Sequence, residues 1–230
     1  MKVTLLQHTP DPEKTVALAA RLCYSAAAIG DLQEKLSSSD VAAFLEKIMS
    51  LGHQSVLEHV SFTFGIEGIS RACSHQLVRH RMASYSQQSQ RYVTFKGDGF
   101  PLVVPDSIAA DPKLEAVFAR TMAACSEAYR ELVQAGVPAE DARFVLPNAA
   151  ETKIIVTMNA RELLHFFELR CCERAQWEIR DMAVEMLKVV KPLAPVIFAG
   201  AGPGCVGEGC PEGKMTCGRA KEVREKFKSI

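Results

Sequence analysis

The sequence predicts an α+β fold: a single domain with a small mixed or antiparallel sheet and several long helices. Two observations lead to this class. Segments with helical periodicity and segments with strand-like alternation are interleaved, but they lack the regular strand–helix–strand rhythm of a doubly wound parallel sheet. In addition, 48% of the 230 residues are hydrophobic, which is enough to bury a substantial core.

The first part of the chain predicts strands at residues 2–7, 60–66 and 91–95, and helices at 12–24, 41–51 and 70–80. The strand at 60–66 rests on alternating apolar residues. The helix at 41–51 is preceded by serines at 37–39 and by Asp40, all of which are N-cap candidates, and Gly52 would end it. A serine-rich loop is expected between the helix at 70–80 and the strand at 91–95.

The second part of the chain predicts helices at 112–136, 138–144, 160–172 and 175–190, and a β-branched strand at 152–158. Asn159 and Glu162 form a capping-box pattern at the start of the helix at 160–172. Residues 196–199 also look strand-like. We expect one domain over residues 1–200, followed by a Gly- and Cys-containing tail over 201–230.

Composition excludes several classes of protein. The 27 basic residues balance the 27 acidic ones, so the chain lacks the positive field of a dedicated nucleic-acid binder. No stretch approaches the roughly 20 apolar residues of a membrane span, and the N-terminus is not a signal peptide. These observations predict a cytoplasmic protein without nucleic-acid or membrane partners, whose eight cysteines are reduced thiols.

The densest polar cluster runs from Arg79 to Tyr92 and combines three arginines, His80 and three serines. Like charges so close together indicate an anionic partner, because arginine can hold a phosphate or carboxylate bidentately. The alternative is that Arg79 and Arg81 merely complement the dipole at the end of a helix, which is worth about 0.3 to 1 kcal/mol each. That alternative leaves the serines unexplained.

Three other motifs are weaker. Residues 202–207 fit G-x-G-x-x-G, but no helix follows and too little chain remains for a dinucleotide fold. Cys205, Cys210 and Cys217 suggest zinc, yet the tail lacks a fourth ligand, so a flexible tail is the simpler interpretation and metal the alternative. His53, Glu58 and His59 do not have metalloprotease spacing.

A second polar cluster lies on or beside the helix at 160–172. Arg161 and His165 are four residues apart and share a face, whereas Arg170 falls nearly opposite Arg161. The helix could therefore serve two ligand surfaces, or it could bend before Arg170. Alternatively, its arginines and Arg174 could pair in solvent with Glu162, Glu168 and Glu173.

Four blocks of the sequence, in order, resemble the flavin-dependent thymidylate synthases. Arg79-His80-Arg81, seven residues and then Ser89 are similar to the family signature R-H-R-x7-S. The segments at 52–59, 142–147 and 159–180 are similar to an upstream, a middle and a C-terminal block. The resemblance covers nearly the whole chain. The tail after Gly200 lies outside it.

The resemblance implies an enzyme that converts dUMP to dTMP, with 5,10-methylenetetrahydrofolate as carbon donor and FAD, reduced by NADPH, as hydride source. It also implies a homotetramer whose active sites are shared between subunits. It assigns no metal. The implied FAD-binding residues are Ser55, Glu58, Arg79, His80, Arg81, Asn159, Arg161 and His165. The implied dUMP-binding residues are Gln76, Arg79, Gln87, Gln88, Ser89, Gln90, Arg91, Arg143 and Arg170. Arg170 is the implied catalytic residue, which ionises the uracil at N3.

Some positions depart from the family pattern. His165 and Arg174 stand where relatives carry other residues, so flavin contacts can differ in detail, and Ser86-Gln87 replaces a pair common in the signature loop. Two other functions remain as alternatives. A non-catalytic sensor would bind dUMP and FAD without turnover, and an RNA- or DNA-binding module would use the arginines and lose affinity steeply with salt.

Overall fold

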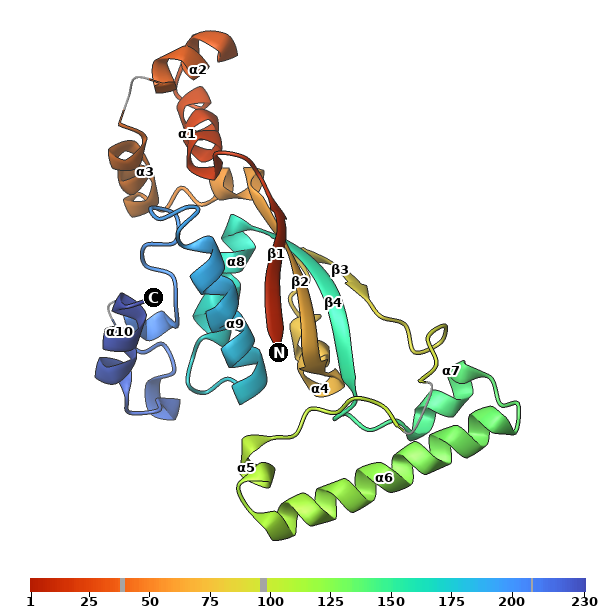
Figure 1. The fold of residues 1–230 in the computed structure, drawn as a ribbon. Coiled ribbons are helices and arrows are strands. Elements are labelled where there is room, and N and C mark those ends of the chain that lie inside the picture. The colour runs from red at the N-terminus through yellow and green to blue at the C-terminus, as the bar shows by residue number, and fades with distance from the viewer. Residues whose placement is uncertain (38–39, 96–98, 208) are drawn as a thin grey trace. The chain divides into compact units, whose positions relative to one another are not determined.

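The structure is a computed structural model that describes residues 1–37, 40–95, 99–207 and 209–230. Its strands form one four-stranded antiparallel sheet in the order β1-β2-β4-β3 (Figure 1). Along the chain, helices lie between successive strands and after the last strand. The strands are β1 (Lys2–His8), β2 (Ser61–Ser70), β3 (Ala83–Gln87) and β4 (Glu151–Asn159). The predicted α+β class with an antiparallel sheet is therefore confirmed.

The chain divides into two compact units, which are described separately. Unit 1 comprises Met1–Lys2, Ile66–Arg79 and Tyr85–Ile155, and unit 2 comprises Val3–Gly65, His80–Ser84 and Val156–Ile230. Every strand has residues in both units. None of the helices in the described ranges is long and apolar enough to cross a membrane.

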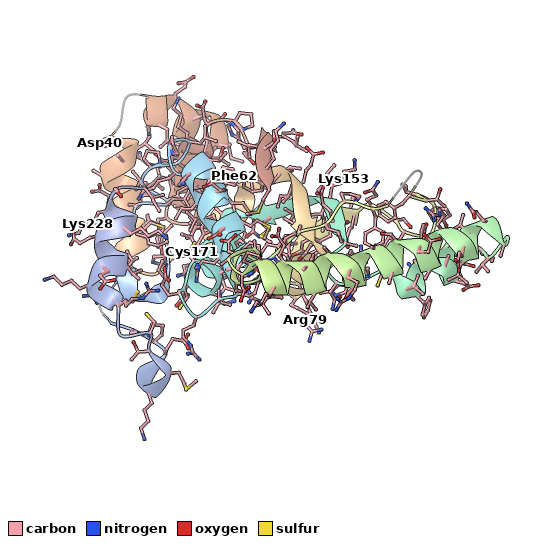
Figure 2. All side chains as sticks on the ribbon, turned by 60° about the horizontal axis from the view of Figure 1, so that its bottom comes forward. Asp40, Phe62, Arg79, Lys153, Cys171 and Lys228 are labelled. Carbon is pink, nitrogen blue, oxygen red and sulfur yellow. The ribbon has the colours of Figure 1, made fainter. Side chains whose placement is uncertain are left out.

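Unit 2 has a core of phenylalanines that connects the sheet to its helices. Phe198 lies between Phe62 of β2 and Phe167 of α8, with ring centroids 5.6 and 6.0 Å away. All three side chains are fully buried, and Figure 2 labels Phe62. Its helices are α1 (Pro12–Leu22), α2 (Ile29–Ser37), α3 (Val41–Ser50), η1 (Ser55–His59), α8 (Ala160–Arg170), α9 (Trp177–Val190), η3 (Gly204–Val206), η4 (Gly213–Met215) and α10 (Ala220–Lys228).

Unit 1 is built around a long amphipathic helix, α6 (Pro112–Gln134), which begins at the N-cap Asp111 as predicted. Tyr129 of α6 is buried and packs against Phe95, which also contacts Phe100. The remaining helices of this unit are α4 (Arg71–Leu77), α5 (Asp106–Ala109), α7 (Ala139–Ala142) and η2 (Arg143–Val145).

Most predicted elements are present, with ends that differ by a few residues. The strand predicted at 60–66 continues to Ser70, and its Phe62, Phe64 and Ile66 are buried as the alternation required. Asp40 caps α3 by accepting a hydrogen bond from the backbone N–H of Ala43, 3.0 Å away. Ser37, another predicted cap residue, is instead the last residue of α2, and Ser38 and Ser39 lie outside the described residues.

Three predictions are wrong. The segment at 91–95 is a turn instead of a strand, because the Val93 N–H bonds back to the Ser89 carbonyl at 3.0 Å. The strand lies earlier, at β3, where a serine loop was expected. Residues 196–199 form turns, with the Phe198 N–H bonded to the Ala194 carbonyl.

The helix expected at 70–80 is shorter than predicted and ends at Leu77. The Tyr85 hydroxyl donates a 2.9 Å hydrogen bond to the Leu77 carbonyl and so satisfies one of the acceptors at the helix end. Arg79 therefore lies beyond α4, and it is exposed (Figure 2). The division at 200/201 remains a prediction, although the tail is folded in part: it carries α10, with Val223 and Phe227 buried.

Candidate active site

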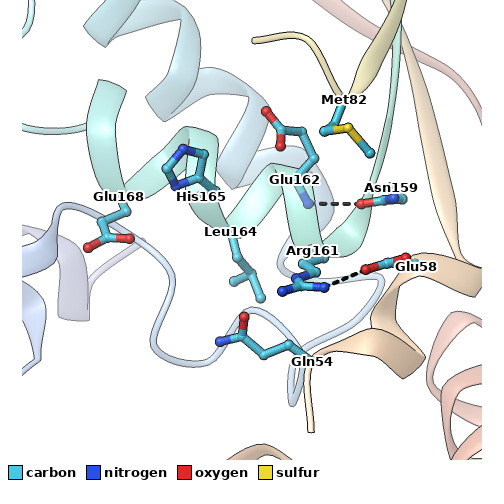
Figure 3. A pocket seen from close by; sticks show the side chains of 9 residues that line it. All are labelled: Gln54, Glu58, Met82, Asn159, Arg161, Glu162, Leu164, His165 and Glu168. Carbon is cyan, nitrogen blue, oxygen red and sulfur yellow. Dashed lines mark hydrogen bonds and ion pairs between the residues drawn. The ribbon is translucent and has the colours of Figure 1, made fainter. Parts of the chain in front are cut away.

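Unit 2 contains a polar cavity of about 490 Å³ beside the N-terminal half of α8 (Figure 3). Both charged and apolar side chains line it: Gln54, Glu58, Met82, Asn159, Arg161, Glu162, Leu164, His165 and Glu168. Four of the five lining residues of α8, at 161, 164, 165 and 168, have the i, i+3, i+4, i+7 spacing of one helix face. The shared face predicted for Arg161 and His165 is therefore confirmed.

Local sequence explains how this face is presented. Asn159 ends β4 and caps α8, since its side-chain oxygen accepts a 2.8 Å hydrogen bond from the Glu162 N–H. Arg161, in the first turn, pairs with Glu58 of η1 across 2.5 Å, and both side chains are about half exposed. The predicted cap is thus confirmed, and the cavity mouth carries a cation, a carboxylate and an amide.

A chain of three polar side chains extends from Glu162, which lines the cavity, through the buried His80 to Arg170. Arg170, the last residue of α8, donates its Nε–H to His80 Nε2 at 3.0 Å, and His80 Nδ1 lies 3.3 Å from Glu162 Oε1. Only 6% of His80 is exposed. Because Nε2 accepts a hydrogen bond, the ring is the neutral tautomer that carries its proton on Nδ1, and Nδ1–H donates to Glu162.

The environment of His80 favours this neutral form. Burial, together with the positive charge of Arg170 and the nearby His165, lowers the pKa of His80 to about 4. Burial also raises the pKa of Glu162. The Phe166 ring packs edge-on against the imidazole, with centroids 4.9 Å apart, and fixes its orientation. Arg170 is therefore held in place by a neutral, immobile partner.

Unit 1 holds a separate cluster at the end of β3. The Gln87 side-chain amide donates to Ser74 Oγ at 2.9 Å and to Thr152 Oγ1 at 3.2 Å, which ties β3 to α4 and β4. In the turn that follows, Ser89 Oγ accepts the Arg91 N–H at 3.1 Å. The two bonds of Gln87 fix the end of β3, and the bond to Ser89 fixes the turn.

Two arginines of unit 1 meet at Glu140. The Arg91 guanidinium lies 2.7 Å from the Glu140 carboxylate, and Arg143 donates its Nε–H to the Glu140 backbone carbonyl at 3.0 Å. Arg71 is close enough to Arg143 that, after burial, this neighbour further lowers its pKa. The result is a basic cluster of Arg71, Arg91 and Arg143, neutralised in part by one carboxylate.

The predicted site residues fall into the two units according to their predicted ligand, with one exception in each set. Unit 2 contains the predicted flavin residues apart from Arg79: Ser55, Glu58, His80, Arg81, Asn159, Arg161 and His165. Unit 1 contains the predicted nucleotide residues apart from Arg170: Gln76, Arg79, Gln87, Gln88, Ser89, Gln90, Arg91 and Arg143. Four of the flavin residues line the cavity: Glu58, Asn159, Arg161 and His165.

The structure also adds residues to the site. Gln54, Met82, Leu164 and Glu168 line the cavity, and Glu140 links two arginines. Leu164 and Glu168 could have been found from the periodicity that placed Arg161 and His165 together. Nothing in the sequence around Glu140 identifies it as the partner of Arg91.

Glu173, one carboxylate of the solvent-pairing alternative, pairs with Arg180 at 3.6 Å and with Arg219, and only 13% of its side chain is exposed. Neither arginine belongs to the α8 cluster, so these pairs do not support that alternative. Within the cluster, Arg161 pairs with Glu58 and Arg170 donates to His80. The prediction that opposite faces of the helix serve two surfaces is consistent with these contacts.

The chain has relatives that match it over nearly its whole length. Residues 4–196 match the protein family described as thymidylate synthase complementing protein. A flavin-dependent thymidylate synthase of Geobacter sulfurreducens is 74% identical over 100% of this chain and 99% of its own length. Proteins of the same description from Clostridium tetani and Pyrococcus furiosus are 50% and 46% identical, over 98% and 100% of this chain and 96% and 98% of their own lengths.

Proposed function

This chain belongs to the family of flavin-dependent thymidylate synthases, and from that premise we propose how its two clusters divide the work of making dTMP from dUMP. The observation that carries the proposal is the contact between Arg170 and His80. It links Arg170, the one predicted nucleotide residue of unit 2, through His80 to Glu162, which lines the cavity. We propose FAD as the flavin, NADPH as its reductant and 5,10-methylenetetrahydrofolate as the carbon donor.

The cavity residues suit a flavin dinucleotide. Arg161 offers a cation to a pyrophosphate, Asn159 and Gln54 offer amide groups, and Met82 and Leu164 offer apolar surface to a ring. Glu58 and Glu168 can accept hydrogen bonds from ribose hydroxyls. When bound, the flavin supplies the hydride transfer, and the protein supplies binding, orientation and electrostatics.

The cluster of unit 1 suits the nucleotide phosphate. Arg91 and Arg143 provide cations, and the turn that begins at Ser89 provides a hydroxyl and backbone N–H groups. Glu140 holds Arg91 by a half-exposed ion pair, which contributes only about 0 to 1 kcal/mol. A phosphate dianion can therefore replace this carboxylate at little cost.

Arg170 is the proposed catalytic group. Its guanidinium has five N–H donors, one of which is directed at His80 and sets the plane of the others. A permanent cation facing the uracil edge stabilises the anion formed when N3 loses its proton, and this charge makes C5 nucleophilic. His80 acts as a positioning residue for Arg170, because its Nε2 accepts the Arg170 Nε–H.

The proposal is tested by an absorbance titration of the purified protein. We expect a flavin spectrum that changes on addition of dUMP, and a smaller or weaker change in the Arg91→Ala variant, which lacks a phosphate cation but keeps the flavin cavity. Colourless protein that does not take up FAD would contradict the assignment of the cavity. Flavin-loaded protein whose absorbance spectrum does not change on addition of dUMP would contradict the assignment of the unit 1 cluster.

A further inference from the structure

A second, smaller cavity in unit 2 is lined by four cysteines. Its volume is about 110 Å³, and Cys172, Cys205, Cys210 and Cys217 all contribute to its wall. Cys172 comes from the turn after α8, and the other three come from the tail beyond residue 200. Cys205 is buried, whereas the other three thiols are partly exposed.

The tail around this cavity is folded but has little apolar material to hold it. Val223 and Phe227 of α10 and Cys205 are its buried hydrophobic side chains, among the described residues from 204 onward. Arg224 donates its Nε–H to the Cys205 carbonyl at 2.6 Å. A Cβ on Gly204 would come within 2.7 Å of Pro211 Cγ, so the two segments are tightly apposed. Short segments with so small a core usually depend on a cross-link.

The spacing of the cysteines is that of a metal site. Cys205 and Cys210 form a C-x4-C pair, and six residues separate Cys210 from Cys217. The sequence of the tail supplies three ligands where structural zinc requires four. The fold supplies the missing one, since it brings Cys172 to the same cavity from more than thirty residues away.

We propose that Cys172, Cys205, Cys210 and Cys217 bind a thiophilic divalent metal ion, Zn²⁺, which fastens the tail to the end of α8. The thiols are already neighbours, because all four cysteines line this one cavity. As the side chains are placed, no group of three or more His, Cys, Asp or Glu among the described residues could hold a metal ion. Binding would therefore require the cysteines to turn about χ1, the one torsion that moves a cysteine sulfur, and each would lose its proton to become a thiolate ligand.

The position of the site gives the metal a structural consequence. Cys172 is two residues beyond Arg170, the last residue of α8. Arg219, at the N-cap of α10, pairs with Glu173 in the same turn. A metal ion bound here would anchor the turn that follows the proposed catalytic arginine. The proposal does not depend on the function of that arginine, because metal content is measured without turnover.

The test is the zinc content of the full-length, flavin-loaded protein after expression with added zinc and removal of loosely bound metal by desalting. We expect about one Zn²⁺ per chain in the wild type and in Cys23→Ser, which changes an exposed cysteine outside the cavity. Cys210→Ser and Cys217→Ser should lose at least nine-tenths of the metal. Circular dichroism and flavin content verify that the variants are folded.

Substitution of Zn²⁺ by Co²⁺ provides a second readout. Thiolate ligation predicts near-ultraviolet charge-transfer absorption and the visible bands of a tetrahedral ion, both absent in Cys217→Ser. Wild-type protein without zinc would overturn the proposal. So would cysteine variants that retain the metal, or a mass lower by two hydrogens per disulfide in metal-free, folded protein.

Discussion

His80 is the most constrained titratable side chain of the candidate site, and its state depends on groups on every side. Arg170 donates to one ring nitrogen, Glu162 accepts from the other, and Phe166 and His165 pack against the ring. Such an arrangement tolerates a neutral imidazole and opposes an imidazolium. The structure therefore links the position of Arg170, the proposed catalytic residue, to the protonation of one histidine.

This linkage predicts a loss of stability in mild acid. The pKa of His80 is about 4 in the folded protein, and near 6.5 when unfolded. Between these values the unfolded chain binds a proton that the folded chain excludes, so the free energy of unfolding falls as pH drops from 6.5 to 4, by at most about 3 kcal/mol. Glu162 has a raised pKa and acts in the opposite direction over the lower part of this window.

The measurement is thermal unfolding of the wild type, His80→Gln and His75→Gln between pH 4 and pH 7.5. The first variant should lose part of the acid sensitivity, whereas the second, at an exposed position of α4, should keep it. Equal pH dependence in all three proteins would show that His80 does not titrate as the structure requires.

A second prediction concerns Glu140. Its replacement should strengthen dUMP binding if the carboxylate competes with the phosphate for Arg91, and weaken binding if the carboxylate positions Arg91. If its carboxylate competes with the nucleotide phosphate for Arg91, then Glu140→Gln should bind dUMP about two- to fivefold more tightly. Arg143 should be unaffected, since it contacts the backbone carbonyl of Glu140. Glu127→Gln, which breaks a similar surface pair with Arg130 on α6, is the control. Weaker binding in Glu140→Gln would mean that the carboxylate positions Arg91.

How far the sequence predicts the site depends on the distance between contacting residues along the chain. The face of α8 follows from helical spacing alone, so Arg161 and His165 were correctly grouped. The contact of His80 with Glu162 spans 82 residues, and that of Arg91 with Glu140 spans 49. No local pattern encodes such pairs, because both depend on how the strands bring their flanking segments together.

Among the elements, α8 carries both the cavity face and Arg170, and its N-cap determines where it begins. Asn159→Ala removes the bond to the Glu162 N–H and should lower the free energy of unfolding by about 1 kcal/mol. Because Asn159 also lines the cavity, this variant should in addition bind flavin more weakly. The cap is therefore expected to affect stability and cofactor binding together.

A matched variant separates these two effects. Asp40→Ala removes an equivalent cap from α3, where Asp40 does not line the cavity, and should cost a similar free energy without loss of flavin. Equilibrium dialysis of FAD and chemical denaturation of both variants provide the comparison. Equal flavin affinity in the two would indicate that Asn159 acts only on the helix.

The two errors in strand assignment share a physical cause. β3 alternates serines with alanine, tyrosine and glutamine at the edge of the sheet, so it lacks the apolar pattern by which β2 was identified. Conversely, residues 196–199 are apolar but form turns, because Phe198 reaches the core without a strand partner in the described sheet. The hydrophobicity of a segment predicts that its side chains are buried, but it does not determine whether the backbone forms a strand or a turn.

For the whole molecule, the division of the predicted residues between two units bears on assembly. We predict the homotetramer expected of the family, with a mass of about 101 kDa, four times the chain mass of 25.2 kDa. If each active site takes residues from more than one chain, co-expressed Arg91→Ala and Arg170→Ala chains should recover dTMP synthesis that neither variant has alone. Light scattering gives the mass. A monomer, or mixed oligomers without recovery, would contradict shared sites.

The most direct measurement is dTMP formation from dUMP, with 5,10-methylenetetrahydrofolate and NADPH, by wild-type and Arg170→Ala protein that carry the same amount of flavin. We expect dTMP from the wild type and a rate at least about 100-fold lower in the variant, because a preorganised cation that stabilises developing charge is lost. An Arg170→Ala protein that forms dTMP at the wild-type rate, or a flavin-loaded wild type that forms none, would contradict the proposed role of Arg170 in dTMP synthesis.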